Sequence, residues 1–231
     1  MSLKDIWKKA VKKPTCIFVY PSRYISIPIT SFLLKTKITP NQVTIISFIF
    51  AILSAVSFLL GKYPFIILGA IFLQTSYILD LIDGEIARYK NLKSTFGAWL
   101  DTTLDSIGLF MICTAIAIGY FIQNNDILTL ILGLLSLLIM ASIGVIESSS
   151  ETFELIKPKN LKIKQKIIEK SKSIRLSKDF YVGIYAPMIT LFTLGPLLNL
   201  VNLMFVLYLI IGVIALIKTS ITKTKLIRDI T

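Results

Sequence analysis

Long apolar stretches dominate this sequence and limit the folds available to it. Six of them approach the roughly 20 apolar residues that a helix needs to cross the hydrocarbon layer of a membrane. The small charged fraction of 16% agrees with this, because a soluble domain of 231 residues needs more charge to cover its surface. The sequence therefore predicts an all-α integral membrane protein, a bundle of six transmembrane helices over residues 43–60, 64–81, 98–122, 127–146, 180–194 and 197–217.

The positive charge of the chain lies in alternate connections between these stretches. The formal net charge is +12, and the basic residues are concentrated before residue 38, at 88–93, at 157–178 and after residue 217. The connections in between contain a single basic residue, Lys62. By the positive-inside rule, this pattern predicts a multi-pass cell-membrane protein with both termini in the cytoplasm. It also makes the lipid bilayer, rather than nucleic acid, the expected partner of the basic residues.

The span count divides the chain into three regions. Residues 1–38 form a cytoplasmic juxtamembrane segment, 39–219 the six-span transmembrane domain and 220–231 a cytoplasmic tail. Lysines near the N-terminus alternate with apolar side chains such as Ile6 and Trp7, which is typical of an amphipathic helix on an anionic membrane surface. A solvated basic tail fits the same pattern equally well.

Four aspartates interrupt the apolar pattern at one depth of the membrane. Asp80 and Asp83 fall at the cytoplasmic end of the second stretch, and Asp101 and Asp105 fall in the opening turns of the third. At 3.6 residues per turn, each pair follows one stripe of its helix. Because carboxylates at membrane depth are costly, they predict a functional site on the cytoplasmic side.

The chemistry of that site follows from the residues that are present and from those that are missing. The sequence has no histidine, and its two cysteines, Cys16 and Cys113, lie far apart. Facing carboxylates need cations to remain ionised, and an all-oxygen site selects a hard metal such as Mg²⁺, Mn²⁺ or Ca²⁺. Two such ions held between the helices suit substitution at phosphorus.

Small residues and one arginine share the stripes of the acids. Gly84 and Ala87 follow Asp83, and Gly97 comes one turn before the third aspartate. Their lack of bulk leaves room for a ligand, although close helix packing is the alternative explanation. Arg88 would meet a phosphate, or else it is only an interfacial arginine of the positive-inside pattern.

Eight residues together complete a longer pattern, D-x2-D-G-x2-A-R-x8-G-x3-D-x3-D. In this the chain resembles the CDP-alcohol phosphatidyltransferase family, and the six spans and the amphipathic N-terminal segment are similar to that family too. The resemblance implies an enzyme of phospholipid biosynthesis that transfers the phosphoalcohol group of a CDP-alcohol, expected to be a CDP-lipid, to an acceptor alcohol and releases CMP. A homodimer is compatible with it. The pattern consists of Asp80, Asp83, Gly84, Ala87, Arg88, Gly97, Asp101 and Asp105.

The resemblance also implies a role for each of these positions. Asp80, Asp83 and Asp101 would ligate two Mg²⁺ or Mn²⁺ ions, and Asp105 would complete the metal site and act as the general base. The stretch 39–44 is similar to one that precedes the first span in the family, although Thr39-Pro40 is also an ordinary helix start. The residues expected at the CDP moiety are Asn41, Thr44, Asp80, Gly84, Ala87, Arg88 and Gly97.

The acceptor alcohol is predicted from the flanking sequence and from the cations near the cytoplasmic boundary. Inositol phosphate or glycerol phosphate is favoured, with Arg23, Arg175 and Lys178 as the cations that would bind its phosphate. The inositol-phosphate members of the family tend to carry arginines at the cytoplasmic end of the fourth span, where this chain reads IESSSETFE. A serine acceptor, as in a phosphatidylserine or archaetidylserine synthase, and a soluble CDP-inositol donor remain open. More remote alternatives are a polyprenyl transferase and a cation transporter.

Overall fold

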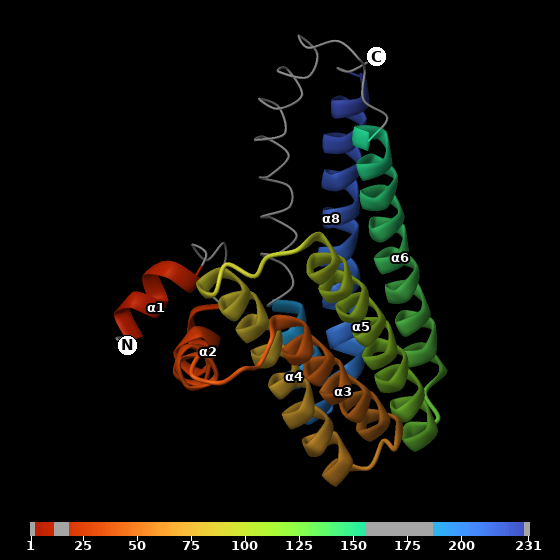
Figure 1. The fold of residues 1–231 in the computed structure, drawn as a ribbon. Coiled ribbons are helices and arrows are strands. Elements are labelled where there is room, and N and C mark those ends of the chain that lie inside the picture. Colours follow the sequence, from red (N-terminus) through yellow and green to blue (C-terminus); the bar gives the residue numbers. More distant parts are fainter. Residues whose placement is uncertain (1–2, 12–18, 156–186, 229–231) are drawn as a thin grey trace.

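The structure is a computed structural model that describes residues 3–11, 19–155 and 187–228 (Figure 1). Within these ranges every regular element is a helix. The elements are α1 (Leu3–Ala10), α2 (Val19–Leu33), α3 (Pro40–Leu59), α4 (Tyr63–Tyr89), α5 (Thr95–Asn124), α6 (Ile127–Leu155), a helix over Pro187–Leu197, and α8 (Val201–Arg228).

Five of these helices, α3, α4, α5, α6 and α8, are long and apolar enough to cross a membrane. This confirms the predicted all-α membrane bundle, but the count of six spans is not reproduced in the described residues. The predicted span 180–194 is represented only by the helix Pro187–Leu197. That helix is about 16 Å long at 1.5 Å per residue, which is too short for the hydrocarbon layer. Residues 180–186 lie outside the described part of the chain.

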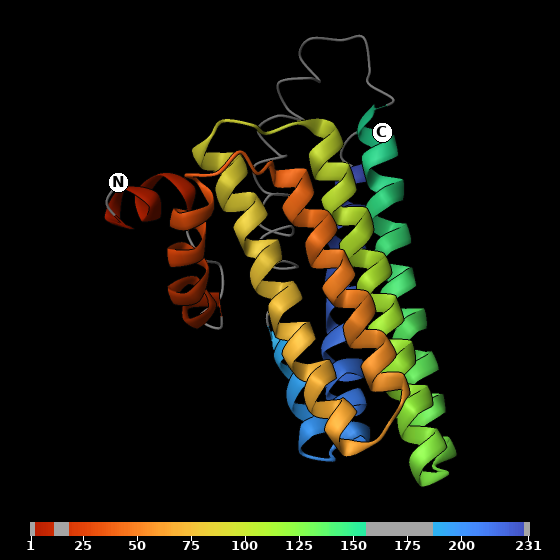
Figure 2. The same cartoon turned by 60° about the horizontal axis from the view of Figure 1, so that its bottom comes forward.

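The long helices form one bundle (Figures 1 and 2). Helix α3 packs against both α4 and α5, while α6 packs against α5 and α8. Between α3 and α5 the approach is very close, because a Cβ added at Gly119 would lie 2.1 Å from the carbonyl oxygen of Phe58. Many large apolar side chains face outwards, as a lipid environment allows; they include Leu53, Ile71, Leu134 and Ile214.

Helix α3 begins at a capping box. Thr39 is the N-cap residue: its hydroxyl accepts a hydrogen bond from the backbone N–H of Gln42, whose side chain accepts from the N–H of Thr39 at 2.9 Å. Pro40 occupies the first helical turn, where its missing N–H costs nothing. This confirms that Thr39-Pro40 is a helix start, and it fixes Asn41 and Thr44 in the opening turns of α3.

The connection between α4 and α5 places the end of α4 and the start of α5 next to the start of α3. Asn91 adopts a positive φ of 55° just after α4 ends, a conformation that asparagine tolerates better than most residues. Nζ of Lys90 donates to the carbonyl oxygens of Thr36 and Ile38, at 3.1 Å each, and so ties this connection to the loop before α3. The hydroxyl of Ser94 caps α5 by accepting from the N–H of Gly97 at 2.9 Å. The start of α3, the end of α4 and the start of α5 therefore meet at one end of the bundle.

A polar clamp joins the helices at the opposite end. Asn202, at the start of α8, donates to Asp126 at 2.6 Å, and the hydroxyl of Thr129 in α6 also donates to Asp126, at 3.1 Å. These hydrogen bonds hold the pKa of Asp126 below its ordinary value of 3.8, and the bond from Asn202 has the largest effect. The clamp fixes α6 against α8.

Helices α1 and α2 lie beside α4, outside the main bundle (Figure 2). The side chains of Ile6 and Ala10 on α1 are fully buried against Ile27 of α2. The ammonium group of Lys9 lies 5.6 Å from the centre of the Tyr89 ring at the end of α4. The first 38 residues thus supply two helices that cover one side of α4.

Candidate active site

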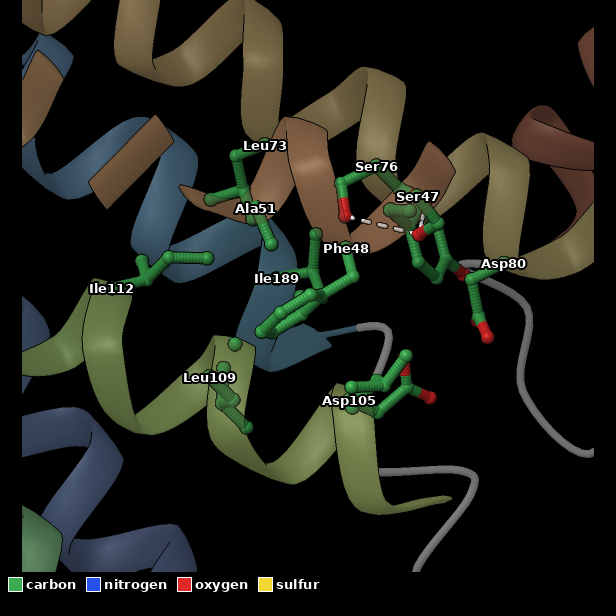
Figure 3. Close-up of a pocket in the computed structure, with 13 residues that line it drawn as sticks. Ser47, Phe48, Ala51, Leu73, Ser76, Asp80, Asp105, Leu109, Ile112 and Ile189 are labelled. Carbon is green, nitrogen blue, oxygen red and sulfur yellow. Dashed lines mark hydrogen bonds between the residues drawn. The ribbon is translucent and has the colours of Figure 1, made fainter. Parts of the chain in front are cut away.

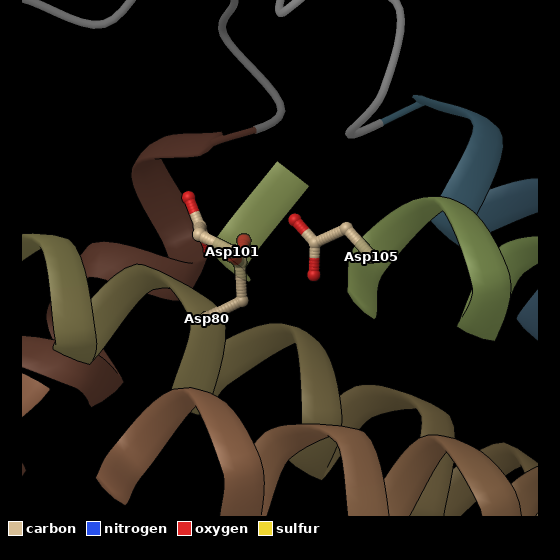
Figure 4. Close-up of side chains that lie close together, drawn as sticks. All are labelled: Asp80, Asp101 and Asp105. Atoms are coloured by element: carbon tan, nitrogen blue, oxygen red, sulfur yellow. The ribbon is translucent and has the colours of Figure 1, made fainter. Parts of the chain in front are cut away.

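Three of the predicted aspartates converge from two helices. One carboxylate oxygen each of Asp80 on α4 and of Asp101 and Asp105 on α5 lies within 4.8 Å of the others. The three side chains are partly buried and point toward one another (Figure 4). Oδ1 of Asp101 is buried without a hydrogen-bond partner among the described residues. The three carboxylates repel one another when they are ionised, and their oxygen atoms are ligands that fit a hard divalent cation.

The fourth predicted aspartate, Asp83, is not part of this three-acid group. Its side chain is buried between α4 and α3, where the hydroxyl of Thr44 donates to Oδ2 at 2.5 Å. Asp83 follows Asp80 by three residues, nearly one turn, and so it lies close to the cluster but reaches α3. The structure thus connects Asp83 to one of the residues predicted to bind the nucleotide.

Gly84 lies under the guanidinium group of Arg88. A Cβ added at Gly84 would lie 2.9 Å from Nη1 and 3.2 Å from Nη2 of Arg88, and the three nearest atoms all belong to this arginine. A side chain at residue 84 would therefore meet Arg88 before it met another helix. Nε of Arg88 donates to the carbonyl oxygen of Ala10 in α1. The neighbouring Ala87, partly buried, is near the end of α4, where its carbonyl oxygen accepts from the N–H of Leu92 at 2.9 Å.

Gly97 and Asn41 come together across the starts of α5 and α3. A Cβ added at Gly97 would lie 3.0 Å from Oδ1 of Asn41 and 3.0 Å from Oγ of Ser94. Among the described residues, and apart from its chain neighbours and its local helix backbone, no other atom lies within 4 Å of that position. Three predicted nucleotide residues, Asn41, Thr44 and Gly97, therefore lie where the ends of α3, α4 and α5 meet.

A small cavity extends from the acids into the bundle (Figure 3). Asp80 and Asp105 lie at one end of it, and Leu73 and Ile112 lie at the other. Its volume is about 20 Å³, room for about one water molecule. Ser47 lines the wall and donates to the carbonyl oxygen of Ser76 at 2.9 Å. The cavity is too small for a polyol and reaches the inner side of Asp105.

Sequence reasoning missed a buried polar network on the other side of α4. The carboxylate of Glu85 is fully buried, and it accepts hydrogen bonds from three side chains of α2: Arg23, Ser26 and Thr30. The three donors are spaced i, i+3 and i+7, so they share one face of a helix in an otherwise apolar stretch. That spacing, together with an acid inside the pattern of eight residues, is the signal that would have predicted the contact.

The cations predicted for the acceptor have different outcomes. Nη1 of Arg23 is engaged with Glu85 at 2.5 Å and lies 3.4 Å from the carbonyl oxygen of Leu81, so Arg23 is held against α4 next to the acids. Arg175 and Lys178 lie outside the described residues. The role of all three at an acceptor stays a prediction.

Comparison with known proteins identifies related sequences. The family model described as CDP-alcohol phosphatidyltransferase matches residues 37–168, which include every residue of the eight-residue pattern. An archaetidylinositol phosphate synthase of Pyrococcus horikoshii is 39% identical over 95 residues, which cover 41% of this chain and 49% of the relative. A phosphatidylinositol phosphate synthase of Corynebacterium glutamicum is 34% identical over 87 residues, 38% of this chain and 39% of the relative.

A bifunctional IPC transferase and DIPP synthase of Aquifex aeolicus is 40% identical over 96 residues, 42% of this chain and 21% of the relative. The chain thus spans less than half of the length of each of these three relatives. Among solved structures, the apo form of a phosphatidylinositol phosphate synthase from Mycobacterium tuberculosis is similar, with a TM-score of 0.59 and 22% identity. That match covers 84% of this chain and 94% of the other, and it indicates a shared fold.

Proposed function

The chain belongs to the CDP-alcohol phosphatidyltransferase family, and from this premise we propose that it transfers the phosphoalcohol group of a CDP-alcohol to an acceptor alcohol and releases CMP. The observation that carries the proposal is the cluster of Asp80, Asp101 and Asp105 at the meeting point of three helix ends. An oxygen-only acidic group at this depth has no structural use that would offset its cost in a membrane bundle.

Asp80, Asp101 and Asp105 would hold a divalent cation, Mg²⁺ or Mn²⁺, and Asp83 would join them to complete a two-metal set. When bound, such ions offset the charge of a diphosphate and make a coordinated alcohol more acidic. The orphaned oxygen of Asp101 supports the assignment, because a buried carboxylate oxygen needs a partner. For Asp83 the hydroxyl of Thr44 already supplies one hydrogen bond and leaves the other oxygen for further contacts.

The residues of this chain then have distinct tasks in the transfer. Asp105 takes the proton of the acceptor hydroxyl while the hydroxyl oxygen attacks the β-phosphorus of the donor. A new oxygen–phosphorus bond forms, and the bond to the bridging oxygen breaks. CMP leaves with that electron pair, and the product is a phosphodiester. A carboxylate is a sufficient base for this step in a chain without histidine.

The donor would lie across the starts of α3 and α5 and the end of α4. Arg88 would contact the diphosphate, and Asn41 and Thr44 would reach the cytidine. The lack of side chains at Gly84, Ala87 and Gly97 would leave room for the nucleotide.

Inositol phosphate is the acceptor that we favour, and the donor is a CDP-lipid in phospholipid biosynthesis. The names of the relatives support this choice, since one is an archaetidylinositol phosphate synthase and another is a phosphatidylinositol phosphate synthase. Arg175 and Lys178 would bind the acceptor phosphate, with Arg23 in support. The site would face the cytoplasm together with both termini, because the basic residues of the sequence lie in the connections on that side.

The test is to incubate the purified chain with a CDP-lipid and Mg²⁺, adding inositol phosphate, glycerol phosphate or serine in separate reactions, and to measure CMP. We expect CMP release with inositol phosphate and much less with the other two. Release with serine alone would overturn the acceptor that we propose, and no release with any acceptor or with soluble CDP-inositol would overturn the reaction.

A further inference from the structure

Glu85 is the most deeply buried charged group in the described part of the chain, and it lies on α4, the helix of Asp80, on the side that faces α2. Its carboxylate is 0% exposed and accepts from Arg23 and Ser26 on one oxygen and from Thr30 on the other. A buried ion pair is not an efficient way to stabilise a fold, because the desolvation of both charges cancels most of their attraction. An apolar contact between α2 and α4 would serve as well, so the pair calls for another explanation.

Arg23 has hydrogen-bonding capacity that Glu85 does not use. Its side chain is 9% exposed, and Nε is buried without a partner among the described residues. Arginine carries five N–H donors in a fixed planar fork, and burying one of them unpaired costs free energy. An anion that arrives with the substrate would provide the missing acceptor.

Arg88 follows Glu85 by three residues on α4, so its guanidinium group extends from the same turn of that helix. It lies over Gly84, the residue before Glu85, and Arg23 contacts the carbonyl oxygen of Leu81, the residue after Asp80. Arg23 thus contacts residues 81 and 85 of α4, and Arg88 lies over residue 84 between them. Two guanidinium groups held together at low dielectric form a site for a doubly charged oxyanion.

We propose that Glu85 is a positioning residue that holds Arg23 beside Arg88, and that the two guanidinium groups together bind a phosphate oxyanion at the edge of the aspartate cluster. This rests on the proposed function, since the substrates of that reaction are the phosphates in question. Ser26 and Thr30 of α2 donate to the Glu85 carboxylate and fix it, so α2 keeps the side chain of Arg23 against α4. The phosphate is either the diphosphate of the donor or the phosphate group of the acceptor.

The decisive variant replaces both members of the pair, Arg23→Met with Glu85→Met. It leaves no buried charge unpaired, and such apolar replacements are often neutral for stability. The hydroxyls of Ser26 and Thr30 can turn to carbonyl oxygens of their own helix. Lys93→Met is the control for the loss of a positive charge alone, because it removes one exposed lysine from the connection between α4 and α5.

Two measurements separate the two phosphates. For a donor phosphate, the Kd of CDP in the presence of Mg²⁺, measured by titration calorimetry, should rise about tenfold in the double variant, as expected when a charge-assisted hydrogen bond is lost. For an acceptor phosphate, the KM of inositol phosphate should rise by a similar factor while the Kd of CDP stays unchanged. Either result supports the arginine pair.

The proposal is overturned if the double variant keeps both constants within about twofold of the wild type at an unchanged melting temperature. It is also overturned if Lys93→Met raises them as much, because the effect would then be one of general charge. Should the double variant fail to fold, Arg23→Lys replaces it, since lysine keeps the charge but lacks Nε and the fork. Failure of the wild type to release CMP would count against the proposed reaction alone, because CDP binding still compares the variants.

Discussion

At the scale of single residues, the contact between Thr44 and Asp83 is the most direct link between the predicted nucleotide residues and the acids. The hydroxyl of Thr44 donates to a buried carboxylate at 2.5 Å, and it also lies 3.2 Å from the carbonyl oxygen of Pro40. Removing this donor leaves the carboxylate without its partner in a place that water does not reach easily.

Thr44→Val should therefore lower the free energy of unfolding by about 1 to 3 kcal/mol and reduce CMP release. Thr44→Ser keeps the hydroxyl and should behave much like the wild type. Thermal melting in detergent and the CMP assay test both variants. Equal melting temperatures for Thr44→Val and the wild type would show that this hydrogen bond does not stabilise the folded protein.

Residues on one stripe were predictable, and their partners were not. The spacing of Asp80, Asp101 and Asp105 along two helices is a local property, so the sequence was enough to predict that they meet. The partner of Glu85 lies 55 to 62 residues away on α2, and no local spacing specifies which face of α4 that helix covers. For the same reason Asp83 was expected with the other acids, although its side chain reaches α3.

At the scale of helices, two glycines of the bundle have opposite surroundings. At Gly119 a side chain would collide with the backbone of α3, whereas at Gly84 the three nearest atoms among the described residues belong to the flexible end of Arg88. Small residues that allow backbones to approach carry helix packing in membranes, and Gly119 is of that kind. Gly84 instead lies beside the side chain of Arg88.

Gly119→Ala should thus lower the melting temperature, since α3 and α5 must separate at a cost of about 1 to 3 kcal/mol. Gly84→Ala should keep the melting temperature and weaken CDP binding, because the guanidinium group of Arg88 has to move. Melting curves and calorimetric titration with CDP distinguish the two. A loss of stability in Gly84→Ala equal to that in Gly119→Ala would return Gly84 to a packing role.

At the scale of the whole molecule, the apolar pattern and the pattern of eight residues predicted the class and the family correctly. Hydropathy decides whether a helix can span a membrane, so five of the spans coincide with long helices. Of the predicted fifth span, the described residues form the short helix Pro187–Leu197. The juxtamembrane segment was predicted to lie on a membrane surface and to supply Arg23 to the acceptor, and the contact of its helix α2 with Glu85 of α4 was not foreseen.

The central claim is that Asp80, Asp101 and Asp105 form a metal centre on which the transfer of a phosphoalcohol group depends. Titration of Mn²⁺ into the purified full chain, followed by electron paramagnetic resonance, tests it most directly. Asp101→Asn changes one charged oxygen for an amide of the same shape, so it should weaken Mn²⁺ binding at least tenfold, about 1.4 kcal/mol or more, while the melting temperature stays close to that of the wild type. Unchanged Mn²⁺ binding in the folded Asp101→Asn variant would contradict the claim.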